Sequence, residues 1–179
     1  MLIKNTDARY GYVAITLHWV MAILIIGMLI VGLYMKGLPI SLQKLKLYGL
    51  HKEFGILILM LVIVRLTWRF NSIIPKLPNN LAFWQKLAAH TSHILLYGFM
   101  FALPITGWMM SSTAGLPVSF FGLFTLPALF TNHHELHIIV KLLHKFLAYG
   151  LIAVLCVHIL AALQHHFIYK DTTLRRMLP

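Results

Sequence analysis

The sequence is poor in cysteine and in charge, and each shortage excludes a class of protein. Its 179 residues include one cysteine, Cys156, which excludes disulfides within the chain, iron–sulfur clusters, cysteine-rich zinc sites and any C-x-x-C-H motif. Charged residues make up 11% of the chain, against about 25% in an average soluble domain. A soluble enzyme is excluded because it could not bury so much apolar surface. A disordered chain is excluded because disorder requires more charge and lower hydrophobicity.

The chain is instead rich in apolar side chains. Hydrophobic residues make up 60% of it, and its mean hydropathy is +0.82. A helix needs about 20 apolar residues to cross the hydrocarbon core of a bilayer. Four windows meet this length, at residues 12–35, 48–69, 84–110 and 137–169. They predict an all-α integral membrane four-helix bundle that forms one domain over residues 1–179.

The stretch between the third and fourth windows is apolar but is interrupted by helix-breaking residues. We expect residues 111–136 to form a loop in the outer interface, because helix breakers are too frequent for a fifth span. The motif of Asn132 followed by Glu135 predicts a capping box for the fourth helix. The helix breakers are Gly115, Pro117, Gly122 and Pro127.

The charge that the chain does carry is basic, with fifteen Lys+Arg against four Asp+Glu. Contact with anionic lipid explains this excess better than nucleic acid, which we do not expect as a partner. The side that would hold both termini has Lys4, Arg9, Arg65, Arg69, Lys76, Lys86, Lys170, Arg175 and Arg176. The opposite side has Lys36, Lys44, Lys46, Lys52, Lys141 and Lys145. This bias predicts that both termini are cytoplasmic.

Histidine is unusually frequent, at eleven residues, and several lie inside apolar windows. His144 and His158 are 14 residues apart on the fourth helix, so they share a face about 21 Å apart along its axis. His18 lies near the inner start of the first span, and His51 lies near the outer start of the second span. By depth, His18 can meet His158 and His51 can meet His144.

Two imidazole pairs at two depths predict two sites for haem b, each iron bound by a pair. Gly55, Ala161 and Ala162 follow these histidines by one turn, where small side chains would admit a flat macrocycle. For each histidine taken alone, a hydrogen bond to a neighbouring helix remains the alternative.

The other histidines have less certain roles. His93, with His90 on the same face of the third span, could compete as a ligand of the inner haem, or could serve a quinone or a proton path. His133, His134 and His137 are expected at the outer interface, and His165 and His166 among inner headgroups.

These residues carry a resemblance to a known family. The motifs are Thr16-Leu17-His18-Trp19, His51 with Gly55-Ile56-Leu57, His90-x-x-His93, Ala102-Leu103-Pro104-Ile105-Thr106-Gly107, Gly122-Leu123, Leu126-Pro127, and His158 through His165-His166-Phe167 to Lys170-Asp171-x-x-Leu174-x-Arg176-Met177. Together they resemble bacterial cytochrome b561, a four-helix di-haem membrane cytochrome, over nearly the whole chain.

The resemblance implies a multi-pass protein of the bacterial inner membrane. It implies haem ligation by His18, His51, His144 and His158, and electron exchange with the quinone pool. One member of the family is a superoxide oxidase, which passes electrons from superoxide on the outer side to ubiquinone. Related cytochromes instead serve a dehydrogenase or hydrogenase as an electron-transfer subunit, so a redox partner protein is the alternative. A histidine-lined metal transporter is a third reading, weakened by the scarcity of membrane carboxylates.

Two clusters of side chains suggest how such chemistry is served. Lys44, Lys46 and Lys52 lead into His51, and we expect them to steer an anionic donor such as superoxide to the outer haem. Contact with lipid headgroups is the alternative for these lysines. Quinone reduction consumes protons, and the inner side offers His90, His93, His165, His166 and Asp171 to supply them.

Overall fold

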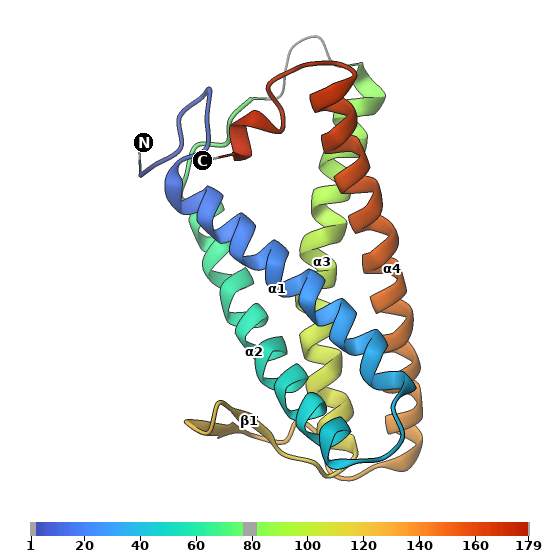
Figure 1. Ribbon diagram of the computed structural model, residues 1–179. Coiled ribbons are helices and arrows are strands. Elements are labelled where there is room, and N and C mark those ends of the chain that lie inside the picture. The colour runs from blue at the N-terminus through green and yellow to red at the C-terminus, as the bar shows by residue number, and fades with distance from the viewer. Residues whose placement is uncertain (1–2, 77–81, 179) are drawn as a thin grey trace.

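The protein is a bundle of four long helices with a small β-hairpin at one end (Figure 1). The computed structural model describes residues 3–76 and 82–178. The helices are α1 (Tyr12–Gly37), α2 (Leu42–Phe70), α3 (Phe83–Thr113) and α4 (His134–Phe167), the strands are β1 (Val118–Phe120) and β2 (Phe124–Leu126), and a short 3-10 helix, η1, covers Arg175–Met177. All four long helices are apolar enough to cross a membrane, which confirms the predicted membrane four-helix bundle.

Helices α1, α2 and α3 extend beyond the predicted spans, most of all α2, whereas α4 begins earlier than predicted and also ends earlier. This helix begins at His134, and the imidazole of His133 accepts a hydrogen bond from the backbone N–H of Leu136. The predicted capping box of Asn132 and Glu135 is therefore wrong. The cap lies one residue later, because an imidazole nitrogen replaces the asparagine oxygen as acceptor.

Packing in the bundle is uneven. Helix α3 packs closely on α4, α1 on α2, and α2 on α3, whereas neither α1 nor α2 packs closely on α4 in the part of the chain described. The buried centre joins the first three helices through Met21, Ile58, Val62 and Met100. Large apolar side chains face outward on every helix, as a lipid solvent allows.

The β-hairpin lies where a loop was predicted, at the end of the bundle opposite the termini (Figure 1). The strands pair antiparallel, and the N–H of Leu123 donates to the carbonyl of Phe120 across a turn. Phe121 and Gly122 have φ values of 48° and 71°, as a type I′ turn requires. Strand β1 packs on α2, and the ring of Phe121 meets that of Phe54 at 5.3 Å. The segment between α3 and α4 thus contains a β-hairpin that packs on α2, and it is not a fifth span.

Hydrogen bonds connect three separate segments at the other end. The side chain of Asn5 donates to the carbonyl of Ile73 at 2.9 Å, and the indole N–H of Trp19 donates to the carbonyl of Met177 at 2.7 Å. The start of the chain therefore contacts the segment after α2, and α1 contacts the segment after α4. Both termini lie at this end, hereafter the inner end in line with the charge bias; their cytoplasmic location remains a prediction.

Candidate functional site

Four of the predicted histidines meet in two pairs at two levels of the bundle. The ring centres of His51 and His144 are 6.5 Å apart, and those of His18 and His158 are 6.4 Å apart. Each of these side chains is partly buried. The partners come from different helices, and α4 contributes one imidazole to each pair, as the 14-residue spacing predicted.

The separation of each pair suits two axial ligands of one metal ion. An imidazole nitrogen lies about 2 Å from a bound first-row metal and about 1 Å from the centre of its own ring, so two opposed ligands have ring centres about 6 Å apart. No three His, Cys, Asp or Glu side chains among residues 3–76 and 82–178 group to hold a bare metal ion. Histidine pairs without a third ligand suit a macrocycle, which provides the remaining donors itself.

Thr106 of α3 fixes the tautomer of His144. The threonine oxygen lies 2.8 Å from the carbonyl oxygen of Ala102, to which its hydroxyl donates, and 3.0 Å from Nδ1 of His144. With its proton used on the helix backbone, the hydroxyl can only accept from the imidazole. Nδ1 of His144 therefore carries the proton, and Nε2 keeps the lone pair that a metal needs.

Two glycines make room at the outer pair. A methyl group on Gly32 would lie 3.3 Å from Cε1 of His51, and one on Gly107 would lie 3.5 Å from Cε1 of His144. At Gly55, which the sequence suggested would admit a flat macrocycle, a methyl group would lie 3.8 Å from Cε of Met28, an ordinary contact. Nδ1 of His51 is buried without a hydrogen-bond partner, so this imidazole is the least satisfied member of the outer pair.

The inner pair has a third histidine beside it. His93 of α3 faces His158 with ring centres 5.7 Å apart, closer than His18. Helices α3 and α4 pack closely, whereas α1 and α4 do not. A flat cofactor is therefore easier to place between His18 and His158, with His93 at its side.

The inner pair also has an arginine on its edge. The guanidinium of Arg65 donates to Nδ1 of His18 at 3.1 Å, because arginine has no acceptor. A neutral imidazole that accepts at Nδ1 carries its proton on Nε2. The tautomer of His18 seen here is thus opposite to that of His144.

The remaining histidines differ in their surroundings. His90 is exposed, while Nδ1 of His137 lies 3.1 Å from the carbonyl of Met110 and is less solvated than expected. His165 donates to Asp171, which also accepts from the backbone N–H of Thr173. Burial would raise the pKa of Asp171, but these hydrogen bonds from Thr173 and His165 outweigh it and lower the pKa below its ordinary value.

The predicted steering lysines are partly engaged with the backbone. Nζ of Lys44 donates to the carbonyl of Leu38, and Nζ of Lys52 donates to the carbonyl of Pro117 at 2.8 Å. Lys46 is exposed. Lys52 thereby ties the residue after His51 to the segment that enters the β-hairpin, while all three ammonium charges remain at this end of the bundle.

Sequence reasoning missed four residues that shape the site. Thr106 and Gly107 stood within a family motif, yet only contact with α4 shows what they do. Nothing in the sequence indicated a role for Gly32, because the residue it contacts, His51, is 19 residues away on another helix. Arg65 was used only as one of the basic residues that predict the orientation of the protein in the membrane. An arginine that lies about one turn inside the end of a predicted span is, however, itself a signal of function.

Comparison with known proteins identifies the family of the chain. A sequence profile of prokaryotic cytochrome b561 matches residues 9–179. "Cytochrome b561 homolog 2" of Escherichia coli K12 is 37% identical over 179 residues, covering 99% of this chain and 95% of the relative. "Cytochrome b561 homolog 1" of the same organism is 35% identical, covering 96% and 97%. "Probable superoxide oxidase CybB" of Yersinia pestis is 31% identical, covering 96% of each. The chain therefore belongs to the prokaryotic cytochrome b561 family of haem-b-binding, multi-pass electron-transfer proteins of the membrane.

Proposed function

We propose that this cytochrome holds two b haems, the outer one between His51 and His144 and the inner one between His18 and His158. The observation that carries the proposal is the presence of two imidazole pairs, at 6.5 Å and 6.4 Å, at two levels of one bundle. Haem b supplies reversible one-electron transfer at its iron. The chain would supply the ligands, the orientation of each imidazole and the exclusion of water.

The chain's own groups support different parts of this task. Thr106 holds His144 with Nε2 bare, and Gly32 and Gly107 leave space beside the outer imidazoles. The apolar helix faces keep water from the imidazoles, which stay neutral and able to bind metal. His93 lies beside the inner pair, where we place it in the surroundings of the haem or of a quinone rather than on the iron.

The proposed reaction moves electrons from superoxide on the outer side to ubiquinone. Two superoxide anions each lose one electron and become two molecules of oxygen, while one ubiquinone gains two electrons and two protons and becomes ubiquinol. The relative named as a probable superoxide oxidase supports this donor. Lys44, Lys46 and Lys52 at the outer end would attract the anion.

The protons would come from the inner end, which we place on the cytoplasmic side of the bacterial inner membrane. His165 and Asp171 form a hydrogen-bonded pair there, and Nδ1 of His166 is buried without a partner. Exposed His90 and partly buried His93 lie one turn apart on α3. These groups form a candidate route from water toward the inner pair.

Haem content tests the proposal directly. The purified protein should contain two low-spin b haems per chain. His51→Ala and His144→Ala should each remove the same haem, and His18→Ala and His158→Ala the other, as measured by pyridine haemochrome stoichiometry and redox difference spectra. His134→Ala, an exposed histidine at the start of α4, is the matched control and should keep both. A single haem, or two haems in a His51→Ala/His144→Ala double variant, would refute the assignment.

Catalysis needs a separate measurement. Anaerobic addition of superoxide should reduce the haems, and added ubiquinone should reoxidise them. Failure of this step with both haems in place would leave the cofactor assignment intact and exclude superoxide as the donor.

A further inference from the structure

The inner end of α2 carries two arginines that have no anionic partner among the residues that the structure describes. Arg65 and Arg69 are both partly buried, one turn apart, and both lie against the ring of Tyr97 at 5.8 Å and 5.9 Å. Neither forms a salt bridge within residues 3–76 and 82–178. Unpaired guanidinium groups at a membrane depth are costly, so they normally mark a site for a negative group.

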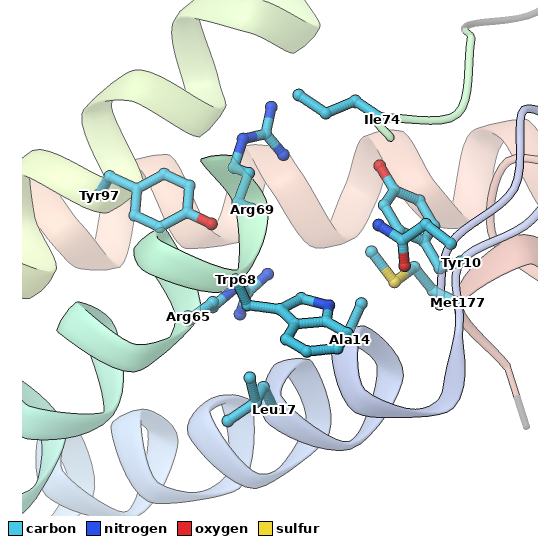
Figure 2. Close-up of a pocket in the computed structure, with 10 residues that line it drawn as sticks. Tyr10, Ala14, Leu17, Arg65, Trp68, Arg69, Ile74, Tyr97 and Met177 are labelled. Atoms are coloured by element: carbon cyan, nitrogen blue, oxygen red, sulfur yellow. The ribbon is translucent and has the colours of Figure 1, made fainter. Parts of the chain in front are cut away.

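The space beside these arginines has room for a small anion. A cavity of about 30 Å³ is lined by Arg65, Trp68 and Arg69 of α2, Leu17 of α1 and Tyr97 of α3 (Figure 2). The indole N–H of Trp68 is buried there without an acceptor in the described part of the chain. Because one water needs about 10–15 Å³ of such space, the cavity fits a carboxylate group and is too small for a quinone ring. Two guanidinium groups and an indole N–H offer only donors.

Arg65 also connects this cavity to the inner histidine pair. It donates to Nδ1 of His18 at 3.1 Å, which places the proton of the neutral ring on Nε2. Metal binding at Nε2 requires that proton to move to Nδ1, where it would face the guanidinium donors instead of an acceptor. Arg65 therefore loses its acceptor when His18 binds a metal, and needs another.

We propose that Arg65 and Arg69 bind a propionate carboxylate of the inner haem, with the indole N–H of Trp68 as a further donor. This inference rests on the proposed haem between His18 and His158. Arginine and carboxylate form charge-assisted, often bidentate hydrogen bonds, the strongest kind available to this cofactor. On haem binding, Arg65 would give up its hydrogen bond to His18 and donate to the propionate carboxylate in its place.

The test uses protein that holds haem labelled with ¹³C at the propionate carboxyls. Redox difference infrared spectra should show labelled carboxylate bands that shift in Arg65→Gln and Arg69→Gln. Arg9→Gln, which removes an exposed arginine at the same end, should leave them unchanged. The midpoint potential of one haem should fall in Arg65→Gln, because loss of a positive charge favours ferric iron. A tenfold change in the reduction equilibrium corresponds to about 59 mV for one electron. Arg65→Lys keeps the positive charge, so the midpoint potential of this variant should return most of the way to that of the unaltered protein.

Three outcomes would overturn the propionate site alone, and a fourth would also refute the proposed haem pair. Labelled bands that stay unchanged while the potential falls would mean that the arginines act on the iron through space. A change confined to phosphate bands would assign the cavity to a lipid headgroup. Fewer than two haems in the unaltered protein would refute the proposed haem pair itself, and this assignment with it. Two haems with no effect of either arginine would refute only the propionate site.

Discussion

Thr106 offers the sharpest test of the outer site, because one hydroxyl sets one tautomer. Thr106→Val keeps the shape of the side chain but removes the acceptor of the Nδ1 proton of His144, now at 3.0 Å. A buried donor left unsatisfied costs about 1–3 kcal/mol, which corresponds to about 5- to 150-fold weaker haem binding. The two effects that contribute are the lost hydrogen bond and the freedom of the imidazole to turn away from the iron.

The assay is haem retention by the outer site, measured as the loss of its absorbance during dilution into excess apomyoglobin. Thr113→Val is the matched control, since Thr113 also donates to its own helix, at Met109, and contacts Nδ1 of His137. His137 is not a proposed ligand, so that variant should lose no haem. Thr106→Ser should keep the hydroxyl and most of the affinity. If Thr106→Val retains its haem as the unaltered protein does, the tautomer argument is refuted.

Three further predictions concern the outer mouth, the outer pocket and the inner end. Reduction of the haems by superoxide should slow as salt shortens the Debye length from about 10 Å at 0.1 M to about 3 Å at 1 M. The triple variant Lys44→Gln/Lys46→Gln/Lys52→Gln should lower the stopped-flow rate constant with both haem spectra intact. A rate constant that changes with neither salt nor the triple variant would mean that these lysines contact lipid headgroups only. Gly32→Val should displace His51 and abolish the outer haem, whereas Gly27→Val on the same helix has open space and should not; equal haem content in the two variants would contradict this. Because the pKa of Asp171 is lowered, its stabilising hydrogen bonds are complete above the ordinary value of 3.8 and are lost as the pH falls through the lowered pKa. Acid should therefore release the segment around Met177 and change the fluorescence of Trp19, and Asp171→Asn should show the released signal already at pH 7; a Trp19→Phe variant with the same acid response would assign the signal elsewhere.

The sequence was sufficient for the bundle because apolar windows of membrane length leave few alternatives. It also predicted that His18 would meet His158 and that His51 would meet His144, since helical rise converts residue number into height. It could not predict lateral contacts. Whether Gly32 or Gly55 faces an imidazole depends on helix rotation, and the rotation is set by packing between helices. The β-hairpin was missed for a similar reason, because strands of three residues carry too little pattern to stand out from a loop.

The contribution of α4 to both histidine pairs has a consequence for how the protein is made. His144 and His158 lie on the last of the four helices to leave the ribosome, so neither pair exists while the first three are being inserted. The hydrogen bond of Trp19 forms later still, because its acceptor at Met177 is synthesised 158 residues after it. If the proposed ligands are right, haem loading is a step that follows membrane insertion, and a stalled chain ending before α4 should carry none. Cells short of haem would then accumulate a complete, inserted apoprotein rather than a partly translated one.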